Sequence, residues 1–136
     1  MSRSGYSDDD NDMGALAMYR RQVASAIRGR RGQAFLRELA ATLDAMPEKV
    51  LITGKLIDDN GNCCAIGVVC KARGIDVTKV DYKDPSQVAA AVGIARSLAA
   101  EIEYENDECG CFGETSQNRW QRMRRWVDRQ LEKAKI

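Results

Sequence analysis

The chain has 136 residues, of which 44% are apolar and 30% charged, and its formal net charge is +1. This size and composition predict one soluble domain with a single core, and no apolar run approaches the roughly 20 residues that a membrane span needs. Histidine is absent, which removes the commonest general base and transition-metal ligand and argues against acid–base or triad catalysis.

The first eleven residues, MSRSGYSDDDN, are polar and acidic and show no periodicity. We therefore predict a flexible acidic arm over residues 1–11, followed by one helical domain over residues 12–136. Asp12 is placed to cap a first helix. The apolar stripe of that helix has helical spacing and consists of Leu16, Tyr19, Val23 and Ile27.

The stretch IRGRRGQAFL, residues 27–36, connects this helix to the next one. Its two glycines indicate a joint, and a second helix is expected from about Gln33 to Met46, where Pro47 stops it. Two amphipathic helices with a short connection predict an αα-hairpin. The joint would expose three basic side chains, Arg28, Arg30 and Arg31.

The middle of the chain combines a strand signal with a helix signal. Residues 50–57 are rich in β-branched and apolar side chains, and Asn60-Gly61 is a strong turn signal, so one short β-hairpin or strand near residues 50–64 is compatible with the sequence. The next stretch, CCAIGVVCKARG, is more typical of a helix that ends at Gly74.

Three further helices are expected: one from Pro85 to residue 92, one over residues 96–104, and one from Ser116 to about residue 133. The sequence thus predicts a mainly α fold, a single compact domain of about five to six helices. The first two of these helices, in QVAAAVGIARSLAAEI, resemble a helix-turn-helix. The acidic residues at the end of the second one would repel DNA, which favours a structural corner instead.

Candidate metal and catalytic residues lack the patterns that such sites need. The five cysteines, at positions 63, 64, 70, 109 and 111, do not show the paired spacing of a zinc site. The acidic side chains of residues 103–108 could contact a hard cation, but no second carboxylate cluster or phosphate loop accompanies them. We predict no catalytic residue, no metal and no cofactor.

Charge is segregated along the chain. Residues 13–55 hold eight basic and three acidic side chains, residues 101–114 hold six acidic and no basic ones, and residues 115–136 hold seven basic and two acidic ones. Such blocks predict faces of opposite charge and charged partners. The acidic block could equally neutralise the basic block that follows it, within the molecule.

The last helix shows the clearest pattern. Its apolar side chains, Trp120, Met123, Val127 and Leu131, share one sector, and a second sector carries Arg122, Arg125 and Arg129. Guanidinium groups bind carboxylates and phosphates equally well in pairs. The candidate binding residues are therefore Arg28, Arg30, Arg31, Arg122, Arg125 and Arg129.

Five stretches cover most of the chain and resemble a family of small accessory proteins of tailed phages and prophages: RSGYSDD, SAIRGRRGQAFLRELAATLDAMPEKVLI, CAIGVVCKARGID, AAEIEYENDE and RWQRMRRWV. The resemblance implies a phage origin and action in the cytoplasm of the infected cell. It implies no catalytic residues. The chain departs from this family in its additional cysteines, Cys63, Cys70, Cys109 and Cys111.

Two functional hypotheses follow from these observations. The first is a non-enzymatic phage accessory protein that binds a host macromolecule through its charged surfaces and inhibits or redirects a host protein, such as a defence component. The second is a nucleic-acid-binding protein that uses residues 28–31 and the last helix. Neither hypothesis involves a membrane.

Overall fold

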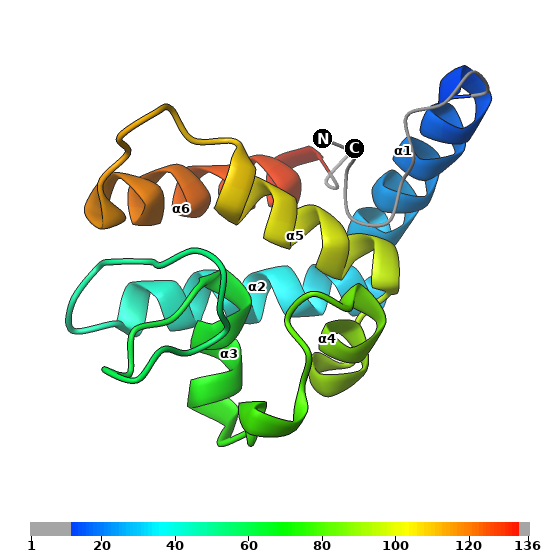
Figure 1. Ribbon diagram of the computed structural model, residues 1–136. Helices are drawn as coiled ribbons and strands as arrows, with labels where there is room; N and C mark the ends of the chain where they lie inside the picture. The colour runs from blue at the N-terminus through cyan, green and yellow to red at the C-terminus, as the bar shows by residue number, and fades with distance from the viewer. Residues whose placement is uncertain (1–11, 134–136) are drawn as a thin grey trace.

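Helices make up most of the computed structural model, which describes residues 12–133 (Figure 1). The predicted acidic arm, residues 1–11, lies outside the described residues. The elements in chain order are α1 (Asp12–Arg28), α2 (Arg30–Ala45), α3 (Ala65–Arg73), the 3-10 turn η1 (Val77–Lys79), α4 (Pro85–Val92), α5 (Arg96–Glu108) and α6 (Ser116–Lys133). The prediction of a mainly helical single domain is confirmed.

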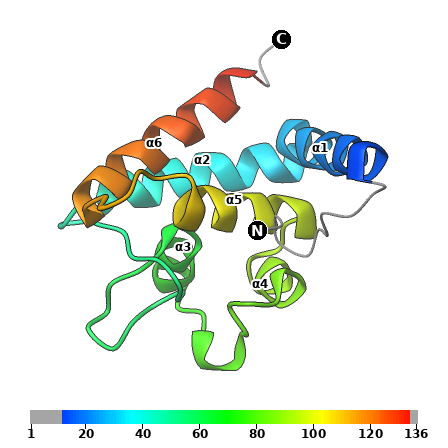
Figure 2. The same cartoon turned by 45° about the horizontal axis from the view of Figure 1, so that its top comes forward.

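Helices α2 and α5 organise the domain, since each of them contacts α1, α3 and α6. Helix α6 runs antiparallel to α2, because its first turns lie beside the end of α2: the Trp120 indole Nε1–H donates to the Leu43 carbonyl oxygen at 3.2 Å. Figure 2 shows α6 beginning beside the end of α2, and α1 joined to the start of α2. The second half of α6 therefore runs toward the start of α2.

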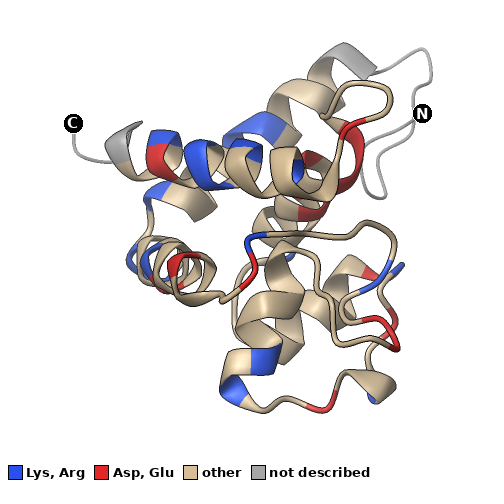
Figure 3. Ribbon diagram, turned by 90° about the vertical axis from the view of Figure 1, so that its left-hand side faces the viewer, with Lys and Arg blue, Asp and Glu red and all other residues tan. Residues whose placement is uncertain are grey.

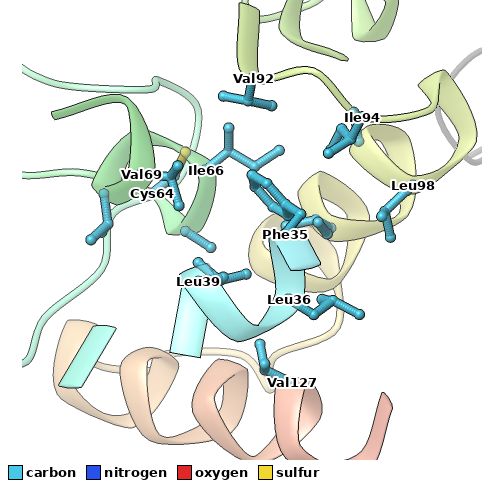
Figure 4. Close-up of a cluster of buried hydrophobic side chains, with 14 of the residues drawn as sticks. Phe35, Leu36, Leu39, Cys64, Ile66, Val69, Val92, Ile94, Leu98 and Val127 are labelled. Carbon is cyan, nitrogen blue, oxygen red and sulfur yellow. The ribbon is translucent and has the colours of Figure 1, made fainter. Parts of the chain in front are cut away.

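The core forms where the apolar stripes of these helices meet (Figure 4). Phe35, Leu36 and Leu39 of α2 are buried against Ile66 of α3 and Val127 of α6. Each fully buried side chain of this size contributes roughly 1.5–3 kcal/mol to folding. The stripes predicted for α1 and α6 point inward as expected, with Tyr19, Val23, Ile27, Met123 and Val127 buried.

The joint between α1 and α2 is shorter than predicted. Gly29 alone separates the two helices, and α2 begins at Arg30 rather than near Gln33. Gly32 lies inside α2, where a Cβ atom would come within 1.8 Å of the Ala26 carbonyl oxygen. This glycine is thus required for the close approach of the two helices and not for a turn. Arg30 and Arg31 consequently stand in the first turn of a helix.

The segment between α2 and α3 is extended but does not form a sheet. Its one β pairing among the described residues is an antiparallel bridge between Ile57 and Cys63 on either side of the predicted turn. Leu51 and Leu56 are buried, and the Leu51 amide donates to the Ser116 carbonyl oxygen at 3.1 Å. The segment is fixed by these contacts with other elements, since no second strand pairs with it.

Helices α4 and α5 form the expected structural corner, with Gly93 in the left-handed conformation at the end of α4. Glu101 and Glu103 are buried, so α5 is an internal helix and could not enter a DNA groove. Helix α5 continues to Glu108, four residues beyond the predicted end. Thr115 caps the start of α6, since its Oγ1 accepts from the Asn118 main-chain amide at 3.0 Å.

Candidate functional site

Among the six candidate arginines, Arg122 is engaged within the molecule. Its guanidinium group donates to the Glu114 carboxylate at 2.7 and 3.0 Å, and to the main-chain oxygens of Glu105 at 2.5 Å and Asn106 at 3.2 Å. The side chain is partly buried between α5 and α6. Arg122 therefore joins the end of α5 to α6 and has little donor capacity left for a partner.

Glu114 neutralises two arginines at once. Its side chain is only 8% exposed and pairs with Arg122 at 2.7 Å and Arg119 at 3.3 Å. The hydrogen bond from Arg122 holds the pKa of the Glu114 carboxyl below its usual range. Figure 3 shows basic positions (blue) along α6, the helix that leads to the C-terminus, and acidic positions (red) on the segments around it. The acidic block thus neutralises part of the basic block, as the sequence allowed.

Two further arginines pair across elements. Arg124 of α6 contacts Asp44 of α2 at 2.8 Å and Asp128 at 2.6 Å, and its hydrogen bond with Asp44 lowers the pKa of that carboxyl. Arg73 of α3 contacts Glu38 of α2 at 2.5 Å. Glu38, Asp44 and Asp128 are thus paired and do not neutralise the other candidate arginines.

The other five candidate arginines are exposed, and none has an ion pair with a residue in the described part of the chain: Arg28, Arg30, Arg31, Arg125 and Arg129. We refer to these five residues as the arginine surface. Arg28 ends α1, the next two begin α2, and the last two lie on the second half of α6. Because α6 is antiparallel to α2, the fold brings these segments toward the same end of α2.

The start of α2 adds to the positive character of this surface. No side chain caps α2, and its first turn contains no acidic residue. The free amide groups of a helix start carry a partial positive charge. Arg30 and Arg31 increase this charge, at a cost to the stability of the helix, and an anionic partner would offset that cost.

A hollow of about 310 Å³ lies between α1, α5 and α6. Arg20 and Arg28 of α1 line it together with Trp126 and Gln130 of α6 and with two acidic side chains of α5, Glu101 and Glu105. Arg28 and the second half of α6 therefore share a cavity, which sequence alone could not establish. The carboxylates of Glu101 and Glu105 make this cavity unfavourable for a phosphate group.

Sequence analysis missed Phe112, which is fully exposed in the loop between α5 and α6. This loop turns at Gly113, which has a φ of +78°, and a Cβ atom at Gly110 would contact the carboxylate of Glu114. The side chain of Glu114, which is itself bound by arginines, therefore packs against this loop at Gly110. The ring of Phe112 is accessible to another protein, and aromatic side chains are enriched at protein interfaces.

Three of the five cysteines lie in the core. Cys63, Cys64 and Cys70 are buried, and burial raises the pKa of the Cys70 thiol to about 11. The Cys64 sulfur accepts from the Gly67 amide at 3.4 Å and caps α3. Among the described residues, no three acidic or thiol side chains lie close enough together to hold a metal ion.

Comparisons with known proteins do not assign the chain to a family. No protein-family model matches it, and neither a curated protein nor a solved structure does. In the described part of the chain, no helix has both the length and the apolar character to span a bilayer. The site must therefore be interpreted from its own geometry.

Proposed function

We propose that this protein is a non-enzymatic binding protein whose arginine surface docks on an acidic macromolecule, in the first place a protein. The observation that carries this proposal is the selective use of charge. Glu38, Asp44 and Glu114 pair with other arginines, while the five residues of the arginine surface keep their donors directed to solvent. Arginine is the preferred residue for pairing with carboxylates at interfaces.

Two features favour a protein partner over nucleic acid. Glu101 and Glu105 line the hollow beside Arg28, so both signs of charge occur there, which suits the mixed charges of a protein surface better than the uniform negative charge of a phosphate backbone. Phe112, in the loop before α6 and so at the other end of this helix from Arg125 and Arg129, adds a separate exposed aromatic ring for a protein contact. In agreement with the resemblance to tailed-phage accessory proteins, we propose that the partner is a host protein in the cytoplasm of the infected cell and that binding inhibits or redirects it.

Charge reversal tests this proposal. A tagged protein would be incubated with host lysate, the captured protein identified by mass spectrometry, and the affinity of the purified pair measured by calorimetry. We expect the Arg28→Glu, Arg30→Glu, Arg31→Glu triple variant to bind at least tenfold more weakly, because each lost charge pair at an interface costs roughly 1 kcal/mol or more. The Arg125→Glu, Arg129→Glu variant should behave in the same way.

Lys55 and Lys79 provide the matched control, since both are exposed and lie away from the arginine surface, in the α2–α3 segment and in η1. The Lys55→Glu, Lys79→Glu variant should retain the affinity of the unmodified protein. If reversal of the arginine surface leaves the affinity unchanged, the proposal is wrong.

Nucleic-acid binding is the second candidate, favoured by the uncapped, arginine-bearing start of α2. Gel-shift experiments with duplex and single-stranded DNA and RNA, at low and moderate salt, distinguish it. A nucleic-acid binder should lose affinity steeply as salt rises and should lose binding in both arginine variants. Absence of a shift at low salt would exclude this candidate.

A further inference from the structure

A second hollow, separate from the arginine surface, lies between α5 and the loop that leads into α4. Its volume is about 430 Å³. Glu103 and Asp107, one helical turn apart on α5, line it together with Tyr82 and Tyr104. Glu105 instead lines the first hollow, the one beside Arg28. The acidic residues of α5 are thus divided between two cavities.

Glu103 is the unusual residue of this hollow. This residue is only 8% exposed, and its carboxylate makes no hydrogen bond or ion pair with any described residue. Its oxygens are not among the fully buried atoms that lack a partner, so water in the hollow reaches them, but an ionised carboxylate that is this enclosed is only weakly hydrated. The neighbouring Asp107 differs, because it accepts from the Tyr82 hydroxyl at 2.5 Å and from the Asn106 amide at 2.7 Å. Glu103 is therefore the group of this hollow that still needs a donor.

The surroundings of Glu103 suit a positively charged donor. Acidic side chains outnumber basic ones around the hollow, which is lined by Asp84, Asp107 and Glu108 in addition to Glu103, against Lys83 and Arg96. Arg96 donates through Nε to the Ser86 hydroxyl at 3.0 Å, which holds it at the rim. The rings of Tyr82 and Tyr104 provide aromatic walls, and aromatic rings attract organic cations and contact their carbon stems.

We propose that this hollow binds an organic cation, a primary ammonium or guanidinium group, which donates to the carboxylate of Glu103 between the two tyrosine rings. The cation is either the side chain of a lysine or arginine of a partner protein or a free amine. This inference does not rest on the arginine surface, and the two proposals stand or fall separately.

Binding at this site is coupled to proton release. Burial, followed by the charge of Asp107, raises the pKa of Glu103 to about 8. A cation binds the ionised carboxylate, so affinity should increase as Glu103 loses its proton. The other groups around Glu103 come from α5, from the loop before α4 and from the start of α3: Tyr104, Asp107, Glu108, Arg96, Tyr82, Lys83, Asp84 and Cys64.

The test uses n-butylguanidinium, which stays protonated throughout the pH range, and follows the backbone amide signals of the full chain by NMR. We expect saturable shifts at residues 82 and 103–107, with about tenfold tighter binding at pH 9 than at pH 7, since the ionised fraction of Glu103 changes by that factor. Butyrate, of the same length and opposite charge, should cause no such shifts.

Two variants make the test specific. Glu103→Gln keeps the shape of the side chain and should lose binding at least tenfold, whereas Glu48→Gln, at an exposed position after α2, should bind like the unmodified protein. Absence of saturable shifts, equal binding by Glu103→Gln, or equal affinity at both pH values would each overturn the proposal. A capped tripeptide with a central arginine separates the two sources: binding indicates a protein side chain, and exclusion of the peptide while n-butylguanidinium binds indicates a free amine.

Discussion

At the scale of single residues, Gly32 determines how closely the first two helices pack. Its missing side chain leaves room for the Ala26 carbonyl oxygen, which a Cβ atom would approach to 1.8 Å. That oxygen belongs to the main chain and cannot rotate away, so any side chain at position 32 must push α1 from α2. Tyr19, Val23 and Ile27 would then lose part of their packing.

We therefore predict that Gly32→Ala lowers the free energy of unfolding by about 2–4 kcal/mol, as overpacking of a close helix contact does. Gly14 is the matched control: it lies in α1, and a Cβ atom there meets nothing within 4 Å. Gly14→Ala should raise stability by about 0.4–1 kcal/mol. Urea unfolding measures both variants, and a Gly32→Ala protein within about 0.5 kcal/mol of the unmodified one would contradict this account.

At the scale of elements, Asn106 attaches the extended segment between α2 and α3 to the rest of the molecule. Its side-chain oxygen accepts from the Ala65 amide at 3.1 Å, and its side-chain nitrogen donates to the Ile52 carbonyl oxygen at 2.9 Å. One buried side chain thus holds both the start of α3 and the segment that would otherwise be an unpaired strand.

Asn106→Ala should lower the free energy of unfolding by about 2–3 kcal/mol, because it leaves two buried main-chain groups without partners. Hydrogen exchange should accelerate most at the amide of Ala65. Asn118→Ala, on the exposed side of α6, should change stability by less than about 0.5 kcal/mol. Unchanged exchange at Ala65 in the Asn106 variant would show that the segment is held in another way.

The same residue explains why some element boundaries could not be read from the sequence. Helix α5 was expected to end near Tyr104, because the stretch that follows, ENDECGCFGET, has the two glycines of a loop. The contacts of Asn106 with distant segments outweigh that local signal. Gly32 likewise made the predicted α2 too short, because a glycine needed for close packing resembles one that ends a helix. Periodicity located the helices correctly, but long-range contacts set their ends.

The candidate site was likewise only partly predictable. The arginines were identifiable from composition and helical spacing, but their pairing was not, since Arg122 reaches Glu114 and the main chain of α5 only in the folded protein. Phe112 carries no sequence pattern, and Glu103 stood out only as one member of the acidic cluster at residues 103–108. Their significance comes from exposure and burial, which depend on how the loop before α6 and the loop before α4 are placed.

At the scale of the whole molecule, paired and unpaired carboxylates give stability two opposite dependences on pH. Hydrogen bonds with arginines lower the pKa of Glu38, Asp44 and Glu114, so the stability that these groups contribute is present above their ordinary pKa values and lost as pH falls. Glu103 acts in reverse. Its pKa rises from 4.5 to about 8 on folding, so the folded state holds a proton that the unfolded state releases, and stability declines as pH rises between these values.

We therefore predict that the free energy of unfolding is greatest near pH 5 and declines by about 2–4 kcal/mol toward pH 8. Glu103→Gln should remove most of this decline, and Glu114→Gln should instead reduce the loss of stability in acid. Urea unfolding at a series of pH values from 3 to 9 measures these effects. A stability that rises from pH 5 to pH 8 would contradict the role given to Glu103.

The arginine surface also has a consequence for the way in which the protein meets other molecules. With a net charge of +1, the chain as a whole would migrate slowly in an electric field near neutral pH. Over distances shorter than the roughly 8 Å screening length of physiological salt, however, a partner experiences the five arginines rather than the total. The field of these arginines would orient an approaching partner during diffusional encounters. The association rate constant should therefore depend on ionic strength more than the dissociation rate constant does.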